Sequence, residues 1–256
     1  MKVVIDIGNT NCKIAVHSKT QILKHWRMQT DVRKTEDEYM VLVQSFFTSA
    51  NISVNEVEGV IICSVVPPIL ATIEQMCKKL FLVTPLVVGP GVKTGLNIKY
   101  ENPREVGSDR IVNAVAALEE HKGMPLIIID FGTATTYCYL NERGDYLGGV
   151  IAPGISIATE ALYTQAARLP RIELKRPRSV VGKTTIEAMQ AGVYYGIIGQ
   201  VEGIVAQLKQ QETTTPRVIA TGGLANLIAY DIPSIDIVDE ALTLKGLAII
   251  YERNQK

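Results

Sequence analysis

A carboxylate, a glycine and a hydroxyl recur in the same order at two places in the chain. The first copy reads Asp6-Ile7-Gly8-Asn9-Thr10, and the second reads Asp130-Phe131-Gly132-Thr133-Ala134. A carboxylate can hold a cation or order water, a glycine lets backbone N–H groups approach phosphate oxygens, and a threonine adds a hydroxyl. Two such turns facing each other would bind the phosphates of a nucleotide between two related halves of the protein.

Two further groups could take part in phosphate chemistry. The first copy continues through Asn11 and Cys12 to Lys13, whose ammonium could neutralise phosphate or simply lie on the surface of an edge strand. The segment Gly107-Ser108-Asp109-Arg110 opens an expected helix, where an aspartate is commonly a cap. Beside a phosphate, Asp109 could instead accept the proton of an attacking hydroxyl, while Arg110 would bind an anionic or polyhydroxyl substrate.

Other glycine segments carry weaker signals. Residues 148–154 end one expected strand and enter a helix whose N-terminus could bind an anion, and Gly222-Gly223 forms another strand-to-helix turn. Gly182-Lys183-Thr184 resembles the end of a P-loop, but Pro177 stands where that motif requires glycine, so we reject it. Four glycines with helical spacing, at 192, 196, 199 and 203, indicate close helix packing, which could occur across a subunit interface.

The elements around the first turn are predicted to be a three-stranded antiparallel meander followed by alternating helices and strands. Runs of β-forming residues predict strands at 2–7, 12–17 and 22–28, with turns at 8–11 and 18–20. The apolar spacing at 34–50 predicts a helix with Thr35 as its N-cap. A buried strand at 57–65, a helix from Pro67 to Leu80 and a short strand at 86–88 complete this half.

The second half repeats this order. Strands are expected at 126–130, 134–140 and 146–151, with a hairpin turn at 141–145, and a further strand is expected at 217–221. Helices are expected at 104–121, 155–165, 185–210 and 239–252. Because both halves begin with three strands and no Ser/Pro-rich linker separates them, we predict an α/β protein whose two similar halves act as one unit.

The overall composition is that of an ordinary globular protein. Of the 256 residues, 47% are hydrophobic and 20% charged, and 26 basic side chains balance 26 acidic ones, so neither nucleic acid nor an anionic membrane is indicated as a partner. Asp6 interrupts the N-terminal apolar run, and no run approaches membrane length, so we expect a cytoplasmic protein. The four cysteines form no C-x-x-C pair, which favours buried free thiols.

Taken together, these segments resemble those of type III pantothenate kinase, a family of the acetate kinase, sugar kinase, Hsp70 and actin superfamily. The matching segments follow the family's order over nearly the whole chain, at 6–13, 107–110, 130–134, 148–154, 182–185, 189–192 and 221–223. The resemblance implies a duplicated ribonuclease H-like (actin-like ATPase) fold, with an N-terminal lobe over residues 1–115 and a C-terminal lobe over residues 116–256. Each lobe would contain a mixed β-sheet flanked by helices.

The resemblance also implies a reaction, the ATP-dependent phosphorylation of pantothenate to 4′-phosphopantothenate in the first step of coenzyme A biosynthesis, with Asp109 as the general base. The residues at the ATP phosphates would be Asp6, Ile7, Gly8, Asn9, Thr10, Asn11, Cys12, Lys13 and Thr133, with Asp6 also near Mg²⁺. The pantothenate contacts would be Tyr100, Gly107, Ser108, Asp109, Arg110 and Thr185. Asp130 would hold a monovalent cation, K⁺ or NH₄⁺, in a homodimer that binds pantothenate near its subunit interface.

Two other functions fit parts of the sequence. A relative that has kept the fold could serve as a nucleotide-dependent regulator without catalysis, although the presence of Asp6, Lys13 and Asp109 favours an enzyme. A kinase of the same superfamily acting on a sugar or a small carboxylate would be expected to carry sugar-kinase signatures and a longer chain, and this sequence has neither.

Overall fold

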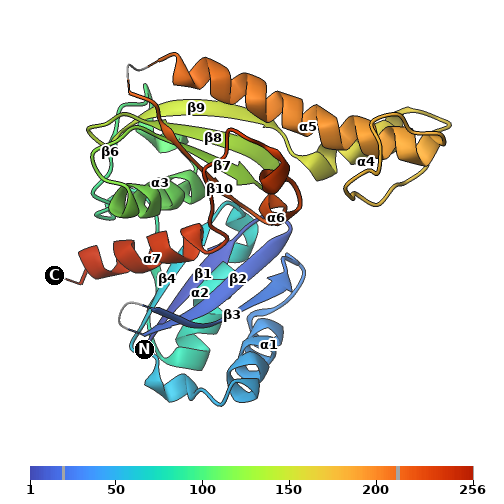
Figure 1. Ribbon diagram of the computed structural model, residues 1–256. Coiled ribbons are helices and arrows are strands. Elements are labelled where there is room, and N and C mark those ends of the chain that lie inside the picture. The colour runs from blue at the N-terminus through green and yellow to red at the C-terminus, as the bar shows by residue number, and fades with distance from the viewer. Residues whose placement is uncertain (19–20, 212–213, 256) are drawn as a thin grey trace. The chain divides into compact units, whose positions relative to one another are not determined.

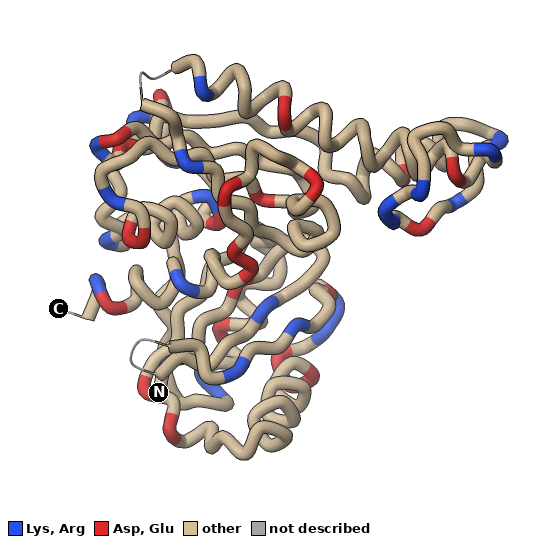
Figure 2. The backbone as a smooth tube through the Cα atoms, in the orientation of Figure 1, with Lys and Arg blue, Asp and Glu red and all other residues tan. Residues whose placement is uncertain are grey.

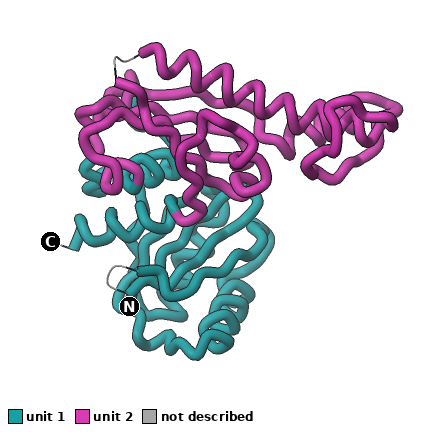
Figure 3. The backbone as a smooth tube through the Cα atoms, viewed as in Figure 1, with its two compact units in different colours: residues 1–95, 102–116, 242–256 teal, residues 96–101, 117–241 magenta. Residues whose placement is uncertain are grey.

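The chain forms two compact units, each of which gathers segments that are distant in sequence (Figure 3). The computed structural model describes residues 1–18, 21–211 and 214–255, so the turn expected at 18–20 lies partly outside the described residues. Unit 1 comprises residues 1–95, 102–116 and 242–256, and unit 2 comprises residues 96–101 and 117–241. Basic and acidic residues are interspersed along the backbone of both units in Figure 2.

A five-stranded mixed sheet forms the centre of unit 1 (Figure 1). Its strands, in the spatial order β3-β2-β1-β4-β5, are β1 (Lys2–Ile7), β2 (Asn11–Ser18), β3 (Gln21–Gln29), β4 (Gly59–Ser64) and β5 (Leu86–Val87). The first three strands are antiparallel neighbours, which confirms the predicted meander, whereas β4 runs parallel to β1 and to β5. The first acidic-glycine turn therefore follows the central strand of the sheet.

Helices pack against this sheet. Those of unit 1 are α1 (Glu36–Ser49), α2 (Pro67–Phe81), the first part of α3 (Ser108–Glu120) and α7 (Leu242–Arg253). α1 and α2 share one buried core with β1, β2 and β4, which includes Ile5 and Tyr39, while α7 packs on β1 and β4. The predicted N-cap of α1 is confirmed, because the Thr35 hydroxyl accepts from the Glu38 N–H and the Glu38 carboxylate accepts from the Thr35 N–H.

Unit 2 is built on a six-stranded sheet that repeats the arrangement of the first. Its strands are β6 (Asn97–Ile98), β7 (Leu126–Phe131), β8 (Ala134–Leu140), β9 (Asp145–Pro153), β10 (Arg217–Thr221) and β11 (Ile237–Val238). The order β9-β8-β7-β10-β11 corresponds to β3-β2-β1-β4-β5, and β6 is added beyond β9. The second acidic-glycine turn joins β7 to β8, so the two turns occupy corresponding places in the two sheets.

The helices of unit 2 follow the same strands. They are α4 (Ile155–Gln165), α5 (Thr185–Lys209) and the short α6 (Ala225–Ile228). Apolar side chains of α5, including Tyr194 and Val201, share one buried core with Ile129 and Phe131 of β7. Among the described residues, no helix is long and apolar enough to cross a membrane.

Two predicted helices begin later than expected, and the reason is local. The helix expected from residue 104 begins at Ser108, because Asn102 caps a separate 3-10 turn at Pro103–Glu105 and Val106 then has extended backbone angles. The helix expected from residue 239 begins at Leu242, because the Asp239 carboxylate accepts from the Ala241 N–H in a turn. The short elements β6, β11 and α6 were not predicted, since so few residues show no periodicity.

The two units are not divided at a single point in the chain. The C-terminal helix α7 belongs to unit 1, and residues 96–101 belong to unit 2 through the pairing of β6 with β9. These units are compact groups of contacting residues and do not test the lobes expected at residues 1–115 and 116–256. The division of the chain into those two lobes stays a prediction.

Candidate active site

The first turn closes the hairpin between β1 and β2. Residues 8–11 connect Ile7 and Cys12, the last pair in register, and the Gly8 N–H donates to the Asn11 carbonyl at 3.0 Å. Asn9 and Thr10 at the tip are exposed. The tip of the turn is therefore open to a ligand such as phosphate.

A row of side chains crosses the sheet beside this turn. Asp6 on β1 is the register partner of Cys63 on β4 and of Lys13 on β2, and Lys13 is the register partner of Arg27 on β3. Register partners point to the same face of a sheet, so the row places one acid between a thiol and two cations. Asp6 and Lys13 are both half-buried, and both could act on the same phosphate group.

The segment that carries Asp109 is tied to the end of β4, next to this row. Ser108, the first residue of α3, donates its hydroxyl to the Ser64 carbonyl at 3.0 Å, and its Oγ lies 3.2 Å from the Cys63 thiol, which can donate to it. Because Cys63 is the register partner of Asp6, the candidate base and the first turn share one region of unit 1. The structure thus brings together Asp6, Lys13 and the segment 107–110.

Burial and the charges of nearby carboxylates raise the pKa values of two thiols in this region. Burial and the Asp6 charge raise the pKa of Cys12. Burial and the charges of Asp6 and Asp109 raise the pKa of Cys63 well above its usual value, although the Ser108 hydroxyl opposes that shift. Both thiols therefore stay protonated at neutral pH, and Cys63 can serve as a donor to Ser108. All four cysteines are free and buried, as predicted.

The Asp109 carboxylate is oriented by a hydrogen bond within the first turn of α3. Its Oδ1 accepts from the Arg110 N–H at 2.8 Å, and a Cβ at Gly107 would lie 2.5 Å from that oxygen, so glycine leaves the carboxylate its space. Asp109 is half-buried, with access to a substrate. Arg110 donates to the Glu105 carbonyl at 3.1 Å and retains further guanidinium donors for an anion.

The sequence patterns did not lead us to predict a role for Thr30 at the first turn. Thr30, just beyond the end of β3, donates its hydroxyl to the Gly8 carbonyl at 2.7 Å and its N–H to the Thr10 carbonyl at 3.0 Å. A signal was present, because the antiparallel meander returns the end of β3 to the edge of the sheet where the β1–β2 turn lies.

Glycines that follow two other strands, β9 and β10, pack closely against the second turn. Residues 132–134 connect the pair Phe131 and Thr135. Gly222 has φ +101, and a Cβ there would lie 2.5 Å from Asp130 Oδ1 and 2.6 Å from the Phe131 nitrogen. A Cβ at Gly154 would lie 2.1 Å from the Thr133 carbonyl oxygen. The backbone of this turn is therefore confined by close packing.

The predicted cation ligand, Asp130, has neutral register partners. It is half-buried and stands opposite Thr136 on β8 and Thr221 on β10. The Thr221 hydroxyl is fully buried and has no hydrogen-bond partner among the described residues. A carboxylate with neutral oxygen-bearing neighbours and a glycine-lined space is suited to a cation.

The remaining predicted substrate residues lie in unit 2. The half-buried Tyr100 ring lies against Gly148, where a Cβ would be 3.3 Å from Tyr100 Cε2. Thr185 is exposed at the first position of α5, and the preceding Thr184 caps that helix by accepting from the Glu187 N–H at 3.2 Å. The segment 182–184 therefore ends as a helix cap, in agreement with the rejection of a P-loop.

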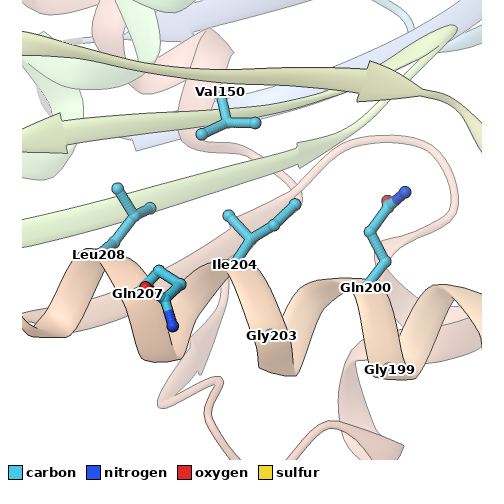
Figure 4. Close-up of a pocket in the computed structure, with 7 residues that line it drawn as sticks. All are labelled: Val150, Gly199, Gln200, Gly203, Ile204, Gln207 and Leu208. Atoms are coloured by element: carbon cyan, nitrogen blue, oxygen red, sulfur yellow. The ribbon is translucent and has the colours of Figure 1, made fainter.

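A cavity of about 410 Å³ lies elsewhere in unit 2, under α5. Figure 4 shows Ile204 and Leu208 of α5 pointing toward Val150 of β9, with Gly199 and Gly203 on the same helix. Its lining includes no residue predicted for chemistry. Across the described part of the chain, no three or more His, Cys, Asp or Glu side chains gather closely enough to hold a metal ion.

Comparison with known proteins gives two kinds of similarity. The sequence profile of the type III pantothenate kinase family matches residues 2–207. A type III pantothenate kinase of Bacillus cytotoxicus is 59% identical over 251 residues, covering 98% of this chain and 95% of that protein. This match extends over every segment described above.

Solved structures resemble the fold at low sequence identity. The activator of the 2-hydroxyisocaproyl-CoA dehydratase from Clostridium difficile, solved with bound ADPNP, has a TM-score of 0.58 and 13% identity, with 99% of this chain and 94% of that chain covered. A protein of Sinorhizobium meliloti assigned as a 2-dehydro-3-deoxygalactonokinase has a TM-score of 0.61 and 10% identity, with 99% of each chain covered. The expected α/β actin-like ATPase fold is thereby confirmed.

Proposed function

The chain belongs to the type III pantothenate kinase family, and we propose that it transfers the γ-phosphoryl group of ATP to pantothenate with Asp109 as the general base. The activity of the family is the phosphorylation of pantothenate in coenzyme A biosynthesis. The observation that carries the residue assignment is the contact of Ser108 with Cys63 and Ser64, which holds Asp109 beside the row that contains Asp6 and Lys13.

The reaction needs a proton acceptor and neutralisation of phosphate charge. Asp109 takes the proton of the terminal hydroxyl of pantothenate as that oxygen forms its bond to the γ-phosphorus. The bond from the γ-phosphorus to the bridging oxygen breaks, and ADP leaves with the electron pair. Lys13 and the exposed tip of the first turn stabilise the negative charge on the phosphates.

We assign the other predicted residues to the two substrates. The ATP phosphates would lie against the first turn from Asp6 to Lys13, with Thr133 of the second turn as a further contact. Pantothenate would contact Tyr100, the segment Gly107–Arg110 and Thr185. Support comes from the exposure of Asn9, Thr10, Thr133 and Thr185. We also propose that the enzyme works in the cytoplasm.

Two kinds of cation fit the residues present. When bound with ATP, Mg²⁺ neutralises phosphate charge, and it usually needs only one or two carboxylates, so the single half-buried Asp6 fits it. At Asp130 the space beside Gly222, which a Cβ would fill, fits K⁺ or NH₄⁺. The buried Thr221 hydroxyl, which has no hydrogen-bond partner among the described residues, could be a further ligand. Asp6 would hold the first cation and Asp130 the second.

We further propose that the protein is a homodimer that packs through α5. A Cβ at Gly192, Gly196, Gly199 or Gly203 would meet no atom of the described residues within 4 Å, so this side of the helix is open to them. Small residues at helical spacing allow another helix to approach closely. Analytical ultracentrifugation of Gly199→Leu should show a shift toward monomer, whereas an unchanged dimer would exclude this face.

The experiment that tests the function is a coupled ADP-release assay over a panel of acceptors, with and without K⁺. We expect ADP release that depends on pantothenate and increases with K⁺. A nucleotide-dependent regulator with this fold would bind ADPNP and release no ADP with any acceptor, and that result would contradict the enzyme. Equal rates in Na⁺ alone would instead remove only the monovalent cation from the proposal.

A further inference from the structure

The residue that follows β3 holds both ends of the tip of the first turn. The Thr30 hydroxyl donates to the Gly8 carbonyl at 2.7 Å, and the Thr30 N–H donates to the Thr10 carbonyl at 3.0 Å. The two acceptors lie on either side of Asn9. Because both are carbonyls, neither bond occupies an N–H group of the turn, and N–H groups are what a phosphate would bind.

A buried tyrosine anchors the backbone next to Thr30. The Tyr39 hydroxyl accepts from the Asp31 N–H at 2.9 Å and donates to the Asp31 carbonyl at 3.0 Å, so it binds both backbone polar groups of that residue. Tyr39 is 0% exposed and belongs to the core of unit 1. We call the three residues Thr30, Asp31 and Tyr39 the turn brace. Through it, the exposed tip of the turn is connected to the buried core of the same unit.

We infer that Thr30 is a positioning residue for ATP, because the turn brace keeps the backbone of the first turn in the conformation that receives phosphate. This inference rests on the proposed role of the first turn. Without the Thr30 hydroxyl, the Gly8 carbonyl loses its partner and the turn spends part of its time in other conformations. The apparent affinity for ATP falls in proportion to the fraction of turns that stay competent.

The test compares substitutions that keep the shape of Thr30 with ones that keep its hydroxyl. Thr30→Val removes one hydrogen bond and retains β-branching, so it should raise both KM for ATP and the Kd for ADPNP about 3- to 10-fold, the range expected from a single hydrogen bond. KM for pantothenate should stay within about twofold of wild type. Thr30→Ser should restore KM for ATP, and Tyr39→Phe should raise it in the same direction as Thr30→Val.

A matched control lies on α1, where the Thr48 hydroxyl donates to the Gln44 carbonyl at 2.9 Å. Thr48→Val removes the same kind of bond away from the turn and should leave both KM values unchanged. If Thr30→Val has wild-type KM for ATP and wild-type Kd for ADPNP, or if Thr48→Val raises these values as much as Thr30→Val does, the inference is wrong. Lys13→Met separates the two proposals, since an unchanged Kd for ADPNP in that variant contradicts the phosphate role of the turn itself.

Discussion

The two acidic-glycine turns close hairpins at corresponding places in their sheets, yet different residues face their aspartates. Asp6 stands opposite Lys13, whereas Asp130 stands opposite Thr136. A lysine beside a carboxylate leaves the first site close to neutral and able to accept the anionic phosphates, while a carboxylate whose register partners are neutral threonines attracts a cation. The residue across the hairpin therefore distinguishes the roles we propose for two turns of nearly the same sequence.

The two turns also differ in how their backbones are held. Thr30 binds the first turn through two hydrogen bonds, and Gly8 has ordinary space except for the Asn11 carbonyl, 3.2 Å from where a Cβ would lie. The second turn is confined instead by Gly154 and Gly222, where any side chain would collide with backbone. Hydrogen bonds allow small adjustments around a ligand, whereas packed glycines fix a rigid cradle.

The largest expected effect concerns the base, which lies beside the first turn. Asp109→Asn removes the proton acceptor with little change in volume, so kcat should fall by about 10²- to 10⁴-fold. The Kd for ADPNP and the unfolding temperature should remain close to wild type. Single-turnover and steady-state assays with pantothenate measure the loss, and Asp37→Asn, an exposed acid on α1, is the control. A rate within a few fold of wild type would remove Asp109 from catalysis.

A second experiment transfers the partner of one aspartate to the other. Thr136→Lys gives Asp130 the cationic neighbour that Asp6 already has, and repulsion by the new charge should raise the K⁺ concentration for half-maximal activity at least about tenfold. Thr136→Met adds similar length without charge and should retain the K⁺ response. If the two variants respond to K⁺ alike, the charge opposite Asp130 does not decide the role of the second turn.

A third experiment compares Gly222, which packs against the second turn, with Gly8, which lies in the first turn. Gly222→Ala places a Cβ on a backbone with φ +101 and 2.5 Å from Asp130 Oδ1, so it should lower the free energy of unfolding by about 1–3 kcal/mol. Gly8→Ala lacks the positive φ and should cost less, below about 1 kcal/mol. Urea titrations measure both. Equal losses would contradict the difference in rigidity between the turns.

The smallest expected effect is on the pH dependence of the free energy of unfolding, and it comes from the end of the first sheet that lies away from the first turn. Burial and the Lys2 charge lower the pKa of His17, which lies at the end of β2 away from the first turn. As the pH falls through about 6.5, His17 is therefore protonated in the unfolded chain before it is protonated in the folded protein. Protonation stabilises the unfolded chain, so the free energy of unfolding decreases until the pH reaches the lower pKa of His17 in the folded protein. Urea midpoints at pH 7 and pH 5.5 should differ less in His17→Leu than in wild type. An identical pH dependence in the two proteins would exclude this residue as the cause.

Much of this architecture could be predicted from local patterns. The Thr35 N-cap, the strands on both sides of each turn and the end of β10 at Thr221 depend on neighbouring residues, and the structure confirms them. The contacts of Thr30 could not be predicted in the same way, because they depend on how the end of β3 meets the β1–β2 turn.

The pairing that distinguishes the two turns was also hidden in the sequence. Lys13 follows Asp6 by seven positions, and the residue seven positions after Asp130 is Tyr137. The second turn is one residue shorter, with 132–134 in place of 8–11, so Thr136 faces Asp130 and Tyr137 is buried in the core. A change of one residue in a turn moves every following side chain to the other face, and only the register reveals it.

The central claim is that the turns have separate roles, and one pair of variants tests it most directly. Lys13→Met and Asp130→Asn are each measured for the Kd of ADPNP and for activation by K⁺. We predict that Lys13→Met weakens ADPNP about tenfold or more and keeps its K⁺ activation, while Asp130→Asn loses K⁺ activation and binds ADPNP within a few fold of wild type. Loss of K⁺ activation in Lys13→Met, with wild-type binding of ADPNP, would contradict the assignment of phosphate to the first turn and the cation to the second.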